Sequence, residues 1–235
     1  MEKNYPDIRD LEKKLNYCFK NTELLNGALI HTSYANEHTK GKNVVRSNER
    51  IEFLGDSVLG LAAGSYIYET YPAMPEGRMS KLRASVVCEG TLADIAFAID
   101  LDKYVRLGVG EEQTGGRKKP SILSDALESV FAAVYLDAGY EVARKVVLSF
   151  IVPEIEKRVD NFILSDYKSS LQEYCAKNHT QVSYEIVGET GPEHSRVFSA
   201  KVLTSDGVMA MGEGRSKKDA EQLAARRLLE LLQNK

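Results

Sequence analysis

The sequence predicts an all-α N-terminal domain followed by a small α+β domain whose elements run α-β-β-β-α. Two observations predict this division. Up to about residue 160, apolar residues recur at helical spacing and strand-like alternation is nearly absent. After about Asn161, segments that alternate polar and apolar residues lie between two helical segments. Because 235 residues are enough for two domains, we place them at residues 5–160 and 164–235.

The first domain is expected to be a succession of helices joined by polar segments. Ser47 or Asn48 offers an N-cap for a long helix, which Pro72 stops. Residues 37–47 and 108–120 contain glycine and lack periodicity, so we expect loops there, the second of them basic. The helices are expected at residues 7–15, 22–31, 48–71, 78–88, 91–99, 122–137 and 141–159.

The second domain is expected to hold three strands between two helices. The turn Ser205-Asp206-Gly207 is typical of a hairpin between the second and third strands. The last helix should begin at Ser216, because Asp219 three residues later forms an approximate capping box. The helices are expected at residues 167–178 and 216–232, and the strands at 181–187, 196–203 and 208–211.

Charge and cysteine content limit the classes of function. The net charge is −3, and residues 166–235 carry ten basic and ten acidic residues, so neither domain is a bulk polycation. Contacts with nucleic acid would therefore need local basic patches. The cysteines Cys18, Cys88 and Cys175 are scattered and odd in number, which fits a reducing cytosol. Without an apolar run or a signal peptide, we expect a cytoplasmic protein and no membrane partner.

Acidic residues gather on the expected long helix and on one later helix. Glu49, Glu52 and Asp56 fall within about 60° of one another around the helix axis. Asp125 and Glu128, three residues apart, likewise share a face. The face beside the first set is apolar, and the residues around the second set are small, so another helix can approach closely. The apolar face comprises Ile51, Leu54, Val58 and Leu61, and the small residues are Ser121, Ser124, Ser129, Ala132 and Ala133.

These two acidic sets suggest a site of four carboxylates between two helices. Oxygen-only ligands select hard cations, so we expect Mg²⁺, for which Mn²⁺ can substitute. Such a cation lowers the pKa of bound water and stabilises the oxygens of a phosphodiester during cleavage. The alternative is that the acids are merely solvated positions on amphipathic helices. A di-iron bundle normally needs Glu-x-x-His, and none of the four histidines supplies that motif.

Three blocks of the sequence closely resemble the ribonuclease III family, in the family's order and at its usual separations. They are Asn48–Ser57 (NERIEFLGDS), Pro75–Ser80 (PEGRMS) and Ser121–Glu128 (SILSDALE). The resemblance covers essentially the whole chain. It implies that the first domain is the catalytic domain and that Glu52, Asp56, Asp125 and Glu128 bind the catalytic metal, with Asp56 and Glu128 as the catalytic pair.

The resemblance also implies roles for three residues near these carboxylates. Glu49 and Glu76 match family acids whose role is the positioning of RNA. Phe53 points away from the acidic face, and from the sequence alone a phenylalanine there is typical of a core residue. In the family the corresponding residue enters a pocket of a second subunit, so Phe53 is a candidate contact in a homodimer formed through the catalytic domain.

The second domain carries local features suited to duplex RNA. Lys217 and Lys218 stand at a helix start, where free N–H groups and the helix dipole also favour phosphate. The loop Gly191–His194 presents a histidine, and Ser169–Glu173 opens a helix with short polar and amide side chains. Together they resemble the double-stranded-RNA-binding domain, which reads A-form shape. The implied contacts are Ser169, Gln172, Glu173, His194, Lys217 and Lys218, and charge alone adds Arg215.

The resemblance therefore implies a metal-dependent endoribonuclease that hydrolyses double-stranded RNA. It implies 5′-phosphate and 3′-hydroxyl ends, with precursor ribosomal RNA and other structured transcripts, among them messenger and transfer RNA precursors, as substrates. The rival interpretation is a double-stranded-RNA-binding protein that keeps the fold without the chemistry. Such a relative should have lost one of the four metal carboxylates, and all four are present here.

Overall fold

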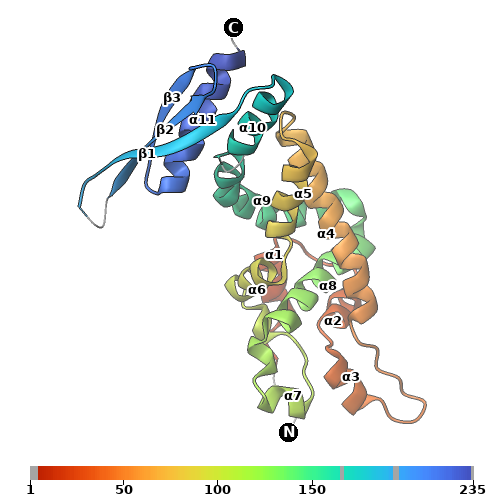
Figure 1. Ribbon diagram of the computed structural model, residues 1–235. Helices are drawn as coiled ribbons and strands as arrows, with labels where there is room; N and C mark the ends of the chain where they lie inside the picture. Colours follow the sequence, from red (N-terminus) through yellow and green to blue (C-terminus); the bar gives the residue numbers. More distant parts are fainter. Residues whose placement is uncertain (1–4, 165–166, 193–195, 234–235) are drawn as a thin grey trace. The chain divides into compact units, whose positions relative to one another are not determined.

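The chain divides into two compact units, Met1–Lys157 and Arg158–Lys235, in a computed structural model that describes residues 5–164, 167–192 and 196–233. The first unit is helical, and the second is built on a three-stranded sheet (Figure 1). The fold class, a helical domain followed by an α-β-β-β-α domain, is therefore the one that the sequence predicts. The finer domain bounds of 5–160 and 164–235 stay a prediction.

The helices of the first unit follow one another with short connections. Among the helices that the structure describes, none is long and apolar enough to cross a membrane. The helices are α1 (Ile8–Leu15), α2 (Thr22–Ala28), α3 (Thr32–His38), α4 (Glu49–Thr70), α5 (Glu76–Val86), α6 (Glu89–Ala98), α7 (Val109–Gln113), α8 (Pro120–Ala138) and α9 (Tyr140–Leu164), with 3₁₀ turns η1 (Leu101–Lys103) and η2 (Gly116–Lys118).

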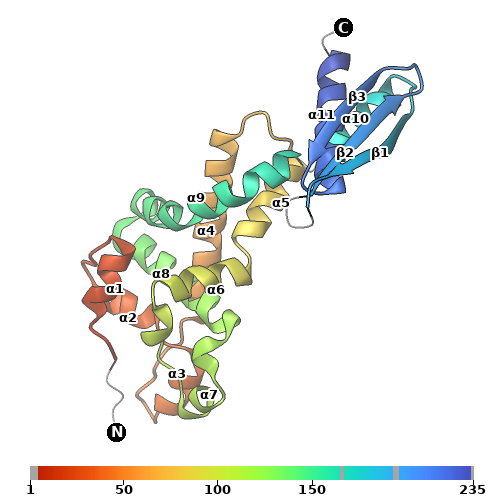
Figure 2. The same cartoon turned by 90° about the vertical axis from the view of Figure 1, so that its left-hand side faces the viewer.

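Helix α8 lies at the centre of this unit, packed against α2, α4 and α6 (Figures 1 and 2). It is buried nearly all round between Ile122 and Val134, which explains why its sequence is apolar and small rather than amphipathic. Helix α4 faces it with a stripe of buried small and branched residues: Gly55, Val58, Leu59, Ala62, Ala63 and Ile67. The expected apolar face of α4 was wrong at Leu61, which is 58% exposed.

Two short helices lie where no helix was expected from the sequence. The expected helix at 22–31 ends at Ala28, because Ile30 leaves the helix to pair with Arg106. A separate helix, α3, then runs into the segment 37–47. Helix α7 and η2 occupy most of the segment 108–120, where the partly buried Arg117 binds the Glu112 carboxylate and the carbonyls of Asp102 and Val105. These distant contacts fix a segment that has no helical pattern of its own.

The second unit packs two helices on one antiparallel sheet. The strands β1 (Val182–Thr190), β2 (Val197–Thr204) and β3 (Met209–Gly214) lie in that order. Gly207 has a positive φ of 87° in the turn between β2 and β3, as a hairpin turn requires. Helices α10 (Tyr167–Lys177) and α11 (Lys217–Gln233) enclose the core with the sheet. Its members include Leu171, Cys175, Val202, Ala210, Ala224 and Leu228.

Candidate active site

Three carboxyl groups from two helices meet between α4 and α8. Glu52 lies on α4, and Asp125 and Glu128 lie on α8. Each offers one oxygen, and these oxygens lie within 4.8 Å of one another. All three side chains are partly buried. The structure thus brings together three of the four acids for which the sequence suggests metal binding.

Asp56 lies beside this group and is more exposed than its members. It falls outside the set of oxygens that lie within 4.8 Å of one another. Its charge nevertheless contributes more than that of any other neighbour to the raised pKa of Glu128. Asp56 therefore belongs to the same electrostatic site, at its open side.

A glycine sets the closeness of the two helices at this point. A Cβ on Gly55 would lie 2.0 Å from the carbonyl oxygen of Glu128 and 2.4 Å from its carbonyl carbon. Only a residue without a side chain permits that approach. Two turns before Gly55, the Asn48 carbonyl oxygen accepts from the Ser129 hydroxyl over 3.5 Å, which also joins α8 to the start of α4. The expectation that small residues on α8 admit a neighbouring helix agrees with this packing, but Gly55 on α4 was missed.

The close packing raises the proton affinity of the carboxyl groups. Burial, followed by the charges of Asp56, Asp125 and Glu52, raises the pKa of Glu128 to about 8. Burial is also the first cause of the raised pKa values of Glu52 and Asp125, and Glu52 is further raised by its acidic neighbours. A positive charge placed among these groups would relieve the repulsion.

The raised pKa of Glu128 predicts a pH dependence of stability in metal-free protein. A carboxyl with a folded-state pKa of about 8 and an ordinary value of 4.5 binds more protons when folded. The stability that this proton binding adds to the folded state is complete below pH 4.5, declines as the pH rises, and is lost above about pH 8. The free energy of unfolding should fall by about 1–3 kcal/mol more in wild type than in Glu128→Gln across this window. Urea titrations with a chelator at several pH values measure it.

The matched control for this prediction is Glu141→Gln, at an exposed position in the first turn of α9. This variant should keep the wild-type slope against pH. Parallel curves for wild type and Glu128→Gln would contradict the prediction.

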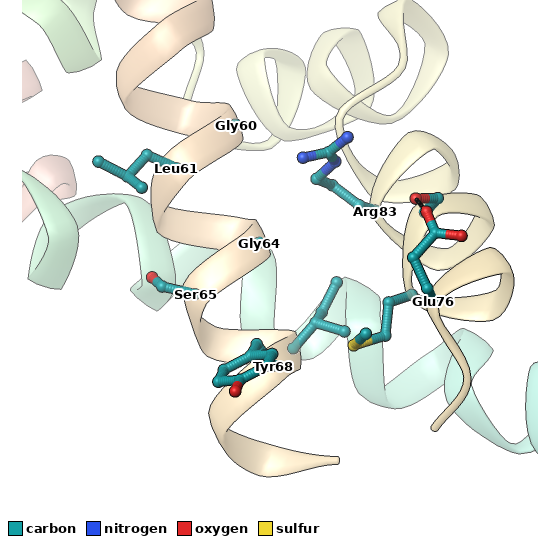
Figure 3. Close-up of a pocket in the computed structure, with 10 residues that line it drawn as sticks. Gly60, Leu61, Gly64, Ser65, Tyr68, Glu76 and Arg83 are labelled. Carbon is teal, nitrogen blue, oxygen red and sulfur yellow. Dashed lines mark hydrogen bonds between the residues drawn. The ribbon is translucent and has the colours of Figure 1, made fainter. Parts of the chain in front are cut away.

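Glu76 lies in a different groove, between α4 and α5. Figure 3 shows the Arg83 guanidinium of α5 extending toward α4 near Gly60 and Gly64, while Glu76 lies along α5 in the same groove. The Ser80 hydroxyl donates to the Glu76 carboxylate over 2.8 Å. The structure therefore does not place Glu76 within the carboxylate group, but opposite the turns of α4 that follow Asp56.

Glu49 lines a cavity on the other side of the carboxylate group, and this cavity includes residues that the sequence did not indicate. Its volume is about 420 Å³, and its lining comprises His31, Thr32, Asn48, Glu49, Glu52 and Asp125. Burial lowers the pKa of the His31 imidazole, against the opposing effect of the nearby acids. Asn48 was predicted only as a helix cap, although its place beside Glu49 was a signal. No signal in the sequence pointed to His31.

Phe53 projects into solvent from α4, with 78% of its surface exposed. Its interpretation as a core residue was therefore wrong. Leu61 and Tyr68, further along the same helix, are 58% and 70% exposed. Their spacing of eight and seven residues keeps all three on one side of α4. These three exposed apolar side chains are therefore candidates for contact with a partner.

In the second unit, the starts of α10 and α11 lie together. The Lys168 ammonium binds the Glu221 carboxylate over 2.7 Å, and the Lys168 backbone N–H donates to the Gln222 side chain. At the other end, the Tyr174 hydroxyl donates to the Leu232 carbonyl. The two helices therefore run parallel.

This parallel arrangement gathers most of the expected RNA contacts at one end of the unit. Ser216 caps α11 as predicted, since its hydroxyl oxygen accepts from the Asp219 N–H over 3.1 Å and its hydroxyl donates to the Asp219 carboxylate. His194 lies outside the described residues. The remaining expected contacts are exposed on the first two turns of α10, at Ser169, Gln172 and Glu173, and at the start of α11, at Arg215, Lys217 and Lys218.

Family models match both units. The model described as "Ribonuclease-III-like" matches residues 21–155, and the model described as "Double-stranded RNA binding motif" matches residues 167–232. The Ribonuclease 3 of Caldanaerobacter subterraneus subsp. tengcongensis is 46% identical over 94% of this chain and 96% of its own length. The chain belongs to the ribonuclease III family. The Ribonuclease 3 of Listeria innocua is 44% identical over 92% of this chain and 93% of its own.

Solved structures agree with this membership. The nuclease domain of the Campylobacter jejuni ribonuclease III is 43% identical, with a TM-score of 0.56, over 62% of this chain and 96% of its own. Its description notes structural flexibility in a region involved in dimer formation of that domain. Membership makes this chain a nuclease of a metal-dependent family, with a helical nuclease domain and a double-stranded-RNA-binding domain.

Proposed function

We propose that this chain is an endonuclease that hydrolyses the phosphodiester backbone of double-stranded RNA, leaving 5′-phosphate and 3′-hydroxyl ends. The observation that carries the proposal is the meeting of Glu52, Asp125 and Glu128 within 4.8 Å, with Asp56 beside them. We further propose that it acts in the cytoplasm on precursor ribosomal RNA and other structured transcripts, as the family resemblance implies. The retention of all four carboxylates argues against a binding protein without catalysis.

The donor set fits a hard divalent cation, and we propose Mg²⁺, for which Mn²⁺ can substitute. All the ligand atoms are oxygens, and burial, followed by the charges of the neighbouring acids, raises the pKa of Glu128 to about 8. Glu52, Asp56, Asp125 and Glu128 would hold the ion, which supplies stabilisation of charge on the phosphate oxygens. Glu49 and Glu76, on either side of the carboxylate group, would position the RNA strand.

The test compares substrates of one sequence: duplex RNA, single-stranded RNA and duplex DNA, each with Mg²⁺ or with chelator. We expect cleavage of duplex RNA with Mg²⁺ only. The product ends should carry 5′-phosphate, measured by ligation, because water and not a ribose hydroxyl attacks. Products with 2′,3′-cyclic phosphate, or cleavage in chelator, would refute the proposal.

We propose that the second unit holds duplex RNA through the starts of α10 and α11. Replacing Lys217 or Lys218 by alanine should weaken binding and reduce the slope of log affinity against log salt by about one unit each, because each lysine displaces a counterion from a phosphate. Filter binding over a series of salt concentrations measures both quantities.

Lys177 provides a matched control, since it lies at the opposite end of α10 and is also exposed. Lys177→Ala should leave the salt slope near the wild-type value. An equal change in slope for all three variants would show that net charge, and not this surface, determines binding.

We also propose a homodimer through the catalytic domain, with Phe53 as a contact. The exposed stripe of Phe53, Leu61 and Tyr68 on α4 supports it, since burial of such side chains is worth about 1.5–3 kcal/mol each. Phe53→Glu should shift the chain from dimer to monomer in light scattering. Val44→Glu, at a residue 65% exposed outside α4, should not. A wild-type monomer at all concentrations would overturn the proposal.

A further inference from the structure

The cavity beside the carboxylate group has two kinds of wall. Glu49, Glu52 and Asp125 contribute carboxylates, which only accept hydrogen bonds when ionised. His31, Thr32 and Asn48 contribute neutral polar groups. Because His31 and Asn48 are far apart in sequence, tertiary structure joins them: the Asn48 backbone N–H donates to the Ile30 carbonyl over 2.8 Å.

The hydrogen bonds of His31 fix the form of its ring. Nδ1 accepts from the Ser33 backbone N–H over 3.2 Å and lies 2.8 Å from the Ser33 hydroxyl. That hydroxyl oxygen already accepts from the Gly108 N–H, so its own hydrogen is directed to Nδ1. The proton of the neutral imidazole therefore sits on Nε2. Within the described part of the chain, this N–H makes no hydrogen bond.

Asn48 adds an amide with open hydrogen-bonding capacity. The residue is only 4% exposed, yet its side chain makes no capping bond to α4 and no other hydrogen bond to the residues that the structure describes. Its backbone is fully used, with the carbonyl accepting from the Ile51 and Glu52 N–H groups. The Asn48 amide atoms are not among the buried polar atoms without a partner, so they reach the cavity, where an occupant can bind them.

The combination of donors and acceptors selects the chemistry of the occupant. Glu52 and Asp125 belong to the proposed ion site, so Glu49 is the carboxylate of this wall that remains to accept a hydrogen bond. A phosphate would accept from His31 but would be repelled by Glu49, and a second hydrated cation would leave the His31 N–H without an acceptor. A neutral hydroxyl satisfies both walls, because it donates to a carboxylate and accepts from an N–H. In duplex RNA, the hydroxyl that the minor groove displays is the ribose 2′-hydroxyl.

We propose that His31 and Asn48 hold a ribose 2′-hydroxyl of the substrate strand in this cavity, beside the carboxylate group. The inference rests on the proposed function and adds a determinant of specificity to it. Through this contact the catalytic domain itself distinguishes RNA from DNA, independently of the second unit.

The test is a double-mutant cycle between the protein and single ribose positions. Duplexes carry one 2′-deoxy nucleotide at successive positions around the cleaved bond. One position should slow wild-type cleavage about tenfold, as expected for one lost hydrogen bond in the transition state. His31→Asn, which keeps an acceptor for the Ser33 N–H, and Asn48→Ala should each be about tenfold slower on unmodified RNA.

The decisive result is the combination of the two changes. At that position, the 2′-deoxy substitution should lower the cleavage rate of either variant by less than about twofold, because the variant has already lost the contact with the 2′-hydroxyl. His38→Asn is the matched control at an exposed histidine, and it should keep the full tenfold penalty. If one variant does not fold, the other carries the cycle.

The same double-mutant cycle is also measured from the dissociation constants of the protein–RNA complexes, with Ca²⁺ in place of Mg²⁺. This binding measurement does not require cleavage. If the effects of the protein substitution and of the 2′-deoxy substitution simply multiply, in both cleavage and binding, the ribose site is overturned. This holds even if wild type cleaves duplex RNA normally. Absence of wild-type cleavage with a coupled cycle in binding would instead contradict the proposed function and leave the ribose site standing.

Discussion

Replacing Glu128 by glutamine is expected to lower the rate of duplex RNA cleavage by about 10³-fold or more. Glutamine keeps the size of the side chain and removes its charge. Glu128 is the most strongly perturbed member of the carboxylate group, since burial and three acidic neighbours raise its pKa to about 8. In the proposed metal site, a bound cation would favour the ionised form of Glu128, and the uncharged glutamine would leave the remaining acids to hold that cation less tightly. Single-turnover cleavage of end-labelled duplex measures the loss.

Binding separates this effect from damage to the fold. The affinity of Glu128→Gln for duplex RNA should stay within about twofold of wild type, because the second unit is unchanged. Glu141→Gln should cleave at the wild-type rate. Cleavage by Glu128→Gln within tenfold of wild type would remove Glu128 from the metal site.

Gly55→Ala is expected to lower the free energy of unfolding by about 3 kcal/mol or more. The added Cβ would stand 2.0 Å from the Glu128 carbonyl oxygen and 3.1 Å from its Cα, so backbone would have to move. Parting α4 from α8 opens the core and also separates Glu52 from Asp125 and Glu128. A displacement of about 1 Å at such a site can lower the rate about 10²-fold. Urea unfolding and single-turnover cleavage test the two effects.

Gly90→Ala is the control for this substitution. Gly90 lies near the start of α6, and an added Cβ there meets nothing within 4 Å. Since alanine favours helix more than glycine does, this variant should be as stable as wild type or slightly more stable. Equal stability of Gly55→Ala and Gly90→Ala would show that the helices can part without cost.

The sequence allowed prediction of those parts of the site that depend on helical phase. Acids spaced three and four residues apart must share a face, so the grouping of Glu52 with Asp56 and of Asp125 with Glu128 follows from local geometry. The capping of α11 by Ser216 and the hairpin turn at Gly207 are equally local. These features depend on neighbours in the chain, which the sequence displays directly.

The parts that were missed depend on contacts between distant segments. Helix α7 forms where Arg117 donates hydrogen bonds to carbonyls 12 and 15 residues away. No local sequence pattern predicts these contacts. The approach of Gly55 to Glu128 joins helices far apart in the chain. His31 enters the cavity because Ile30 pairs with the backbone of Asn48. In each of these cases the sequence shows the residue, but not the distant residue that it contacts.

The separation of α4 from α8 along the chain has a consequence for synthesis. A ribosome releases the chain from its N-terminus, so the acids of α4 emerge well before those of α8, which ends at Ala138. Until then the buried stripe of α4 has no partner to pack against, and the carboxylate group is incomplete. A nascent chain therefore completes the carboxylate group only after Asp125 and Glu128 of α8 have emerged, although Glu52 and Asp56 emerge much earlier.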